Sequence, residues 1–163
     1  MKKSLSKKEL LNLIHKAKQE LKKDKVMQKS FKKYNVDIEE IDFIPTIFKE
    51  LDVSATTDHG VVYLNTKLIQ DGKFDEKDYS YMVHEYIHWL QQTARKNPTK
   101  SSDDGDYLEN PYEQESFKNQ VEYMAKEIGE DYAEDYVDHL LKYHNVKNKK
   151  EKKEKKEVLM SQV

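Results

Sequence analysis

Apolar residues gather most densely between positions 81 and 90 of this polar chain, and mainly polar residues flank that stretch. Its apolar members are Tyr81, Met82, Val83, Tyr86, Ile87, Trp89 and Leu90. Their density predicts a helix buried in the protein core. We expect this helix to begin near Asp75 and to continue to about Ala94, because Pro98 cannot continue it.

Two helices are predicted within residues 1–35, the helical N-terminal part of the chain. The sequence Ser6-Lys7-Lys8-Glu9 has the pattern of a capping box. Apolar residues follow it at helical spacing, namely Leu10, Ile14, Ala17 and Leu21. A second helical stretch is marked by Met27, Phe31 and Tyr34 and is expected to stop near Asn35.

A β-hairpin is predicted in the next part of the chain. Residues 37–42 indicate one more helical turn, which Pro45 interrupts. The apolar residues at 47, 48 and 51 fit a strand or a helix equally well. Two β-rich runs follow, Val53–Thr57 and Val61–Asn65, separated by the turn sequence Asp58-His59-Gly60. His59 is expected to lie at the surface.

The C-terminal third is predicted to be helical. Residues 97–106 are the most loop-like segment. A helix is then expected to start with Asn110 as its N-cap and Pro111 as its first residue. Residues 131–143 indicate a last amphipathic helix, with His139 and His144 expected as surface or cap residues near its end. Residues 146–163 form a Lys/Glu tail, either a solvated helical extension or disordered.

Composition limits the chemistry that the chain can perform. The absence of cysteine excludes disulfides, thiolate metal sites and cysteine nucleophiles, so that a metal must be held by His, Asp or Glu. Residues 1–33 hold twelve Lys against three acidic residues, whereas residues 34–144 hold ten basic against twenty-five acidic residues. The acidic body suits a divalent cation, and the Lys-rich ends are expected to be solvated faces. With neither a secretory signal nor a membrane span, we expect a cytoplasmic protein.

The motif that carries chemistry lies in the apolar stretch. His84 and His88 are four residues apart, so on a helix both imidazoles project from one face and can bind one metal ion. Glu85 lies beside the first histidine and within reach of a metal-bound water that it can deprotonate. This is the HExxH pattern of zinc hydrolases. A catalytic zinc takes three protein ligands, and Glu109, Glu113 and Glu115 compete for the third position.

The segment His84-Glu85-Tyr86-Ile87-His88, followed by a glutamate on a later helix, resembles the gluzincin branch of zinc metallopeptidases. Together with residues 110–117, it also resembles small metallopeptidase-like proteins encoded by bacteriophages and mobile elements of Gram-positive bacteria, and more distantly the ImmA/IrrE type. The metzincin pattern does not fit, because Gln91 and Ala94 occupy positions where it needs glycine and histidine.

The resemblance implies a fold, a metal and a set of roles. One Zn²⁺ ion would be bound by His84, His88 and Glu115, with Glu85 as general base and acid. Glu113 would either hydrogen-bond to one of these ligands or replace Glu115 as the third ligand. The implied fold is α+β, a zincin-like minimal metalloprotease fold, mostly helical with a small β-hairpin or sheet beside the active-site helix. A single domain would span residues 1–145, with its catalytic core at 53–128.

The predicted function is hydrolysis of peptide bonds in a protein or peptide substrate, with a host or phage protein as a possible target. Val61–Leu64 is the candidate for an exposed strand that pairs with the substrate, with an ordinary structural strand as the alternative. The oxyanion would need a further donor, for which Tyr107, Tyr112 and Tyr123 are candidates. Two other functions stay open: a non-catalytic zinc-binding regulator, and a nucleic-acid-binding protein that uses the Lys-rich ends.

Overall fold

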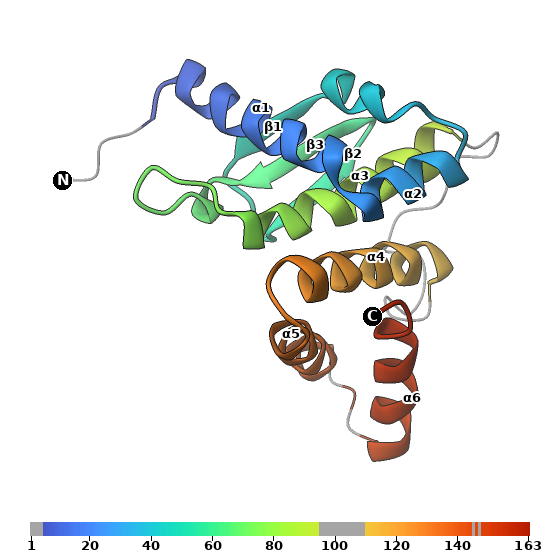
Figure 1. Ribbon diagram of the computed structural model, residues 1–163. Coiled ribbons are helices and arrows are strands. Elements are labelled where there is room, and N and C mark those ends of the chain that lie inside the picture. Colours follow the sequence, from blue (N-terminus) through green and yellow to red (C-terminus); the bar gives the residue numbers. More distant parts are fainter. Residues whose placement is uncertain (1–4, 95–109, 145, 147) are drawn as a thin grey trace.

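The computed structural model describes residues 5–94, 110–144, 146 and 148–163, and its architecture is α+β with helices predominating (Figure 1). The α-helices are α1 (Lys7–Lys23), α2 (Lys25–Lys33), α3 (Tyr79–Thr93), α4 (Pro111–Glu127), α5 (Glu130–Tyr143) and α6 (Lys149–Leu159). The strands are β1 (Thr46–Lys49), β2 (Ala55–Asp58) and β3 (Val61–Asn65), and the short 3₁₀ helices are η1 (Ile38–Phe43), η2 (Thr66–Leu68) and η3 (Glu76–Asp78). The coarse expectation of a mostly helical α+β protein is confirmed.

The N-terminal helices begin at caps that the sequence encodes. Ser6 Oγ accepts a hydrogen bond from the Glu9 amide at 3.1 Å, and the Glu9 carboxylate accepts one from the Ser6 amide at 3.0 Å. This reciprocal pair confirms the predicted capping box. Asp24 ends α1 and caps α2, because its carboxylate accepts from the Met27 amide at 2.9 Å. The positive φ of Asn35 then turns the chain away from α2 toward η1.

The three strands form one sheet in the order β1-β3-β2. β2 and β3 pair antiparallel around the turn at His59 and Gly60, both with positive φ, so the predicted hairpin is confirmed. β1 pairs parallel with β3, which decides the open choice for Ile47 and Phe48 in favour of a strand. The prediction that Val61–Leu64 is the exposed edge is wrong, because β3 is paired on both sides. The edge strand beside α3 is β2.

The core has two parts, and α3 and α4 lie between them. One cluster of buried apolar side chains joins α1, α2, the sheet and α3, with Met82, Val83 and Ile87 contributed by α3. The other joins α4, α5 and α6. Figure 1 shows α3 between the sheet above and α4 below. The helix carrying the histidines is therefore covered on both sides, as its apolar composition predicts.

The Lys/Glu tail forms a helix that packs against the rest of the protein. Leu159 near the end of α6 is only 2% exposed and belongs to the apolar cluster of α4 and α5. Lys156 of α6 pairs with Glu134 and Asp138 of α5 at 2.8 and 3.0 Å. The helical alternative for the tail is thus the observed one, and its apolar end is docked.

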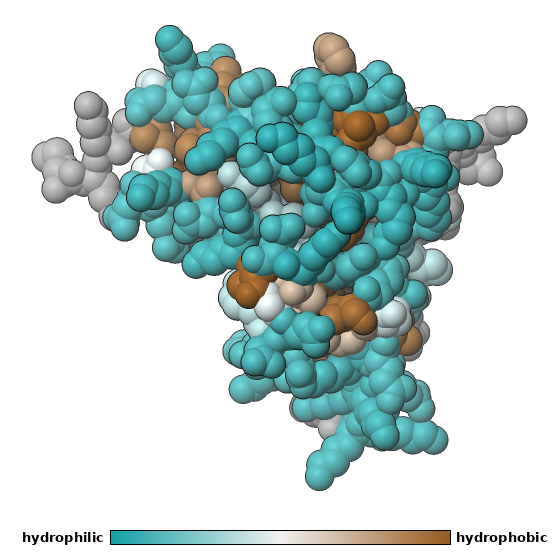
Figure 2. Space-filling model, in the orientation of Figure 1, coloured by the Kyte–Doolittle hydropathy of each residue, from teal (hydrophilic) through white to brown (hydrophobic). Residues whose placement is uncertain are grey.

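The surface is strongly polar. Figure 2 shows one face that is mostly hydrophilic, with apolar residues in small separate groups. Among the described residues, no helix combines the length and the apolar character needed to cross a membrane. The predicted loop at 97–106 lies outside the described residues.

Candidate metal centre

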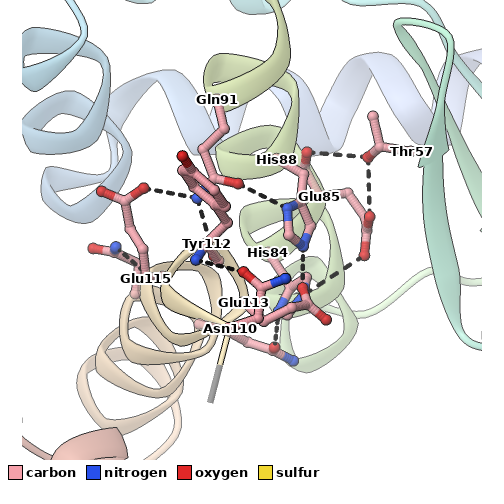
Figure 3. Close-up of polar contacts among 11 residues, drawn as sticks. Thr57, His84, Glu85, His88, Gln91, Asn110, Tyr112, Glu113 and Glu115 are labelled. Atoms are coloured by element: carbon pink, nitrogen blue, oxygen red, sulfur yellow. Dashed lines mark hydrogen bonds and ion pairs between the residues drawn. The ribbon is translucent and has the colours of Figure 1, made fainter. Parts of the chain in front are cut away.

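The two histidines of the motif lie one turn apart on the face of α3 that packs against α4. His84 is 4% exposed, and its ring centroid is 4.9 Å from that of His88. The Nε2 atoms of both rings point toward Glu113 of α4 (Figure 3). The ring of Phe117 packs edge-on against the His84 ring, with the centroids 4.5 Å apart. The His84 imidazole is therefore tightly packed, and His88 is largely but not fully buried.

Glu113 lies in the first turn of α4, just after its cap. Asn110 caps the helix by accepting from the Tyr112 amide at 2.9 Å, and Pro111 is its first residue, as predicted. The Glu113 Oε1 atom is 3.1 Å from His84 Nε2 and still closer to His88 Nε2. The three potential ligand atoms of His84, His88 and Glu113 all lie within 4.8 Å of one another.

Glu115, the residue assigned as third ligand by resemblance, lies elsewhere. Its carboxylate contacts Lys33 and Tyr34 at the end of α2 and accepts from Gln91 Nε2 at 2.7 Å. Two positions along a helix correspond to about 200° of rotation, so the carboxylates of Glu113 and Glu115 leave α4 in different directions and reach different residues. The geometry therefore brings Glu113, the alternative candidate, and not Glu115 to the two histidines. Glu109 lies outside the described residues.

The sequence contained a signal that Glu113, and not Glu115, faces the histidines. Phe117, Val121 and Met124 form one stripe of buried apolar residues on α4. Extended backward by one turn, their stripe reaches Glu113, which lies four residues before Phe117, and misses Glu115.

Each histidine is also held through its second ring nitrogen, by a glutamine that the motif did not indicate. His84 Nδ1 is 2.8 Å from Gln120 Oε1, and His88 Nδ1 is 2.9 Å from Gln91 Oε1. Both glutamines are buried. A metal-ligating histidine commonly donates its other ring N–H to such an oxygen, which fixes the orientation of the ring.

Glu85 is held from the edge of the sheet. Thr57 Oγ1 on β2 lies 2.9 Å from Glu85 Oε1 and 3.2 Å from the Glu85 carbonyl oxygen. The other carboxylate oxygen is 4.0 Å from His84 Nε2 and faces the cluster. Figure 3 shows Thr57 and the histidines on opposite sides of this carboxylate. Thr57 is a contact that the sequence did not point to.

Within the cluster, Glu113 and His88 each shift the pKa of the other toward the charged form. Burial acts to raise the pKa of Glu113, but hydrogen bonds from His84 and His88 outweigh it and hold this pKa far below its usual range. Burial likewise acts to lower the pKa of His88, but Glu113 and Glu85 outweigh it and raise that pKa. The cluster thus favours a carboxylate anion between two imidazoles.

A cleft of about 770 Å³ opens onto this cluster. Residues of β2, including Thr56 and Thr57, line one wall, and side chains of α4 and α5 line the other. Of the tyrosines proposed as oxyanion donors, Tyr112 lines the cleft. Tyr123 does not line it, because its hydroxyl lies 3.3 Å from the Glu76 carbonyl oxygen, and Tyr107 lies outside the described residues.

The remaining histidines differ in their positions. His139 is exposed and its ring bonds to the Asp135 carbonyl oxygen at 2.8 Å, and the His59 side chain is 93% exposed in its turn, so both are surface residues as expected. His144 follows α5 as its cap residue, also as expected, and in addition lines the cleft.

The residues present fit a metal ion. Two imidazole nitrogens and a carboxylate oxygen converge, which is a common donor set for a catalytic zinc. The second oxygen of Glu113 is buried without a hydrogen-bond partner among the described residues, and a metal ion or an ordered water can satisfy such an atom. Comparisons of the chain with family models, curated proteins and solved structures give no match.

Proposed function

We propose that this protein is a zinc-dependent metallopeptidase with a zincin-like arrangement of active-site helix and sheet. The observation that carries the proposal is the convergence of His84, His88 and Glu113 at a cleft, with Glu85 held beside them. His84, His88 and Glu113 would bind the ion through Nε2, Nε2 and a carboxylate oxygen. The bound zinc would supply Lewis acidity, which polarises a carbonyl group and acidifies water.

The residues of the chain account for the proton transfers. Glu85 takes the proton of the attacking water through the carboxylate oxygen that faces the cluster, because Thr57 occupies its other oxygen. Glu85 then passes that proton to the amine that leaves when the peptide bond breaks. The burial of Glu85 keeps bulk water from competing for the proton.

Strand β2 makes a peptide the best-fitting substrate. One side of β2 pairs with β3, and among the described residues its other side has no strand partner. Residues 53–58 line the cleft directly beside Glu85. An extended peptide can add to such an edge through main-chain hydrogen bonds, with its scissile bond over the cluster.

The contact between Thr57 and Glu85 favours catalysis over a purely structural metal site. A structural site needs only the ligands, whereas here a second carboxylate, that of Glu85, is buried and held beside them. Nucleic-acid binding is disfavoured because several lysines of the basic helices already pair with acidic side chains. These are Lys22 with Glu39 and Asp42, Lys29 with Glu122, Lys33 with Glu115, and Lys156 with Glu134 and Asp138.

The test combines metal analysis with a cleavage assay. We expect about one zinc per chain in wild type, and none after His84→Ala or Glu113→Ala, because each variant loses a ligand. His139→Ala and Glu122→Ala are the matched controls, since they change a histidine and a glutamate outside the cluster and should retain zinc.

Glu85→Gln should keep zinc and lose hydrolysis of casein or of a fluorogenic peptide library, because an amide cannot act as the base. Absence of zinc from wild type after zinc is supplied would contradict the metal site. Undiminished cleavage by Glu85→Gln would contradict the mechanism.

A further inference from the structure

We infer that Glu115 and Gln91 are positioning residues that keep a proton on His88 Nδ1 and so reserve His88 Nε2 for the metal. The inference builds on the proposed function and assigns a role to the glutamate that does not reach the cluster. It rests on the set of hydrogen bonds made by Gln91, a residue of α3 that is fully buried against α4.

The neighbours of Gln91 determine which way its amide points. One end of the amide lies 3.0 Å from the Tyr112 carbonyl oxygen and 2.7 Å from Glu115 Oε1. A carbonyl oxygen and a carboxylate oxygen can only accept hydrogen bonds, so this end must be the NH₂ group, with both of its hydrogens in use. The amide oxygen of Gln91 therefore faces His88.

The orientation of the amide in turn determines the state of the imidazole. The amide oxygen of Gln91 is 2.9 Å from His88 Nδ1 and can only accept, so Nδ1 must carry a hydrogen. In the neutral ring the lone pair then belongs to Nε2, the atom that faces Glu113. The direction of donation runs from His88 to Gln91 and from Gln91 to Glu115.

Glu115 is itself held by the N-terminal helices. Its carboxylate contacts the Tyr34 hydroxyl and the Lys33 ammonium group, which lie at the C-terminal end of α2. Residues 33 and 34 thereby connect to the metal cluster through Glu115 and Gln91. The N-terminal helical part therefore acts on His88 through these two side chains.

His84 lacks an equivalent arrangement, which makes it an internal comparison. Gln120 Nε2 has no well-formed hydrogen bond among the described residues, and the nearby Tyr136 hydroxyl can donate as well as accept. The orientation of Gln120 is therefore not imposed in the way that the orientation of Gln91 is. Both histidines contact a glutamine, but only at His88 do the neighbours of that glutamine fix the direction of its amide.

The first measurement is the zinc dissociation constant, by competition with a chromophoric chelator. Glu115→Leu should weaken zinc binding by about 10- to 100-fold, the usual effect of removing such a support. Glu122→Leu is the matched control, because Glu122 also lies on α4 and pairs with a lysine of α2, Lys29, but does not touch Gln91. Glu115→Gln keeps an acceptor for Gln91 and should bind zinc almost as wild type does.

The second measurement uses the metal-free protein and reports the hydrogen bond itself. A ¹H–¹⁵N spectrum should show the Nδ1 proton of His88 as a slowly exchanging signal in wild type, Glu122→Leu and Glu115→Gln. In Glu115→Leu the amide of Gln91 is free to turn, and this signal should exchange with water at least about ten-fold faster, as expected for a lost hydrogen bond.

The outcomes separate the two proposals. An unprotonated Nδ1 in wild type, or equal zinc affinities for Glu115→Leu and Glu122→Leu, overturns the positioning role and leaves the peptidase proposal intact. Failure of wild type to bind zinc overturns the peptidase proposal, while the exchange measurement still decides how Gln91 and Glu115 act on His88. Thermal unfolding of each variant verifies that it is folded.

Discussion

At the scale of single residues, Glu113 shows how an ionised carboxylate can be kept inside this protein. The side chain is 1% exposed, and burying an unpaired carboxylate is costly. Two imidazoles at its Oε1 atom offset that cost, while Oε2 remains without a partner among the described residues. A cation bound by His84, His88 and Glu113 would balance the buried negative charge of this carboxylate.

Thr57 allows a prediction at the same scale. Thr57→Val removes the hydroxyl that holds Glu85 and keeps the shape of the side chain. A hydrogen bond to a charged group contributes about 1.5–3 kcal/mol, so loss of the aligned base should lower kcat at least about ten-fold. Zinc content should not change, because Thr57 is not among the potential ligands.

The control for this prediction is Thr57→Ser, which retains the hydroxyl and should recover most of the activity. If the valine and serine variants have the same kcat, the hydroxyl does not position Glu85. The quantities to compare are kcat and KM on one fluorogenic peptide, measured beside metal content.

At the scale of elements, local signals predicted the helices and the hairpin, and contacts distant in sequence decided the rest. The capping box at Ser6 and the turn at Gly60 are encoded within a few residues, and both were predictable. The pairing of β1 with β3 joins residues 46–49 to residues 62–65, and no local pattern specifies that register. The edge strand was misassigned for this reason.

The same distinction applies to the site. The spacing of His84, Glu85 and His88 was sufficient to bring them together, because one helix carries all three. Which glutamate lies beside the two histidines depends on how α4 is rotated about its own axis, and its packing against α3 determines that rotation. Thr57 reaches Glu85 only because β2 lies beside α3, and a threonine in a short strand gives no sign of this in the sequence.

Helix α6 supports a prediction at the element scale. Leu159 is the buried residue of this highly charged helix, so Leu159→Ala should lower the free energy of unfolding by about 2–4 kcal/mol. Val158 is 37% exposed, and Val158→Ala should cost less than about 1 kcal/mol. Urea unfolding followed by circular dichroism measures both, and equal effects would mean that α6 is not docked through Leu159.

At the scale of the whole molecule, the candidate metal centre joins the two halves of the core. His84 and His88 belong to α3, which packs on the sheet, and Glu113 belongs to α4, which packs on α5 and α6. The residues at the end of α2 reach the same region through Glu115. A metal bound by His84, His88 and Glu113 would therefore link the sheet-containing half to the helical half.

Because the three potential ligands come from both halves, we predict that zinc stabilises the whole fold. A ligand that binds only the folded state adds about 2.7 kcal/mol when its concentration is one hundred times Kd. For a chain of this length that corresponds to a rise in Tm of about 5–10 °C over the chelator-treated protein. Differential scanning calorimetry with and without zinc measures it, and His84→Ala should show no such rise. A local site would stabilise only its own helix and broaden the transition, whereas a link between the halves should shift a single transition upward, because neither half can then unfold without releasing the metal.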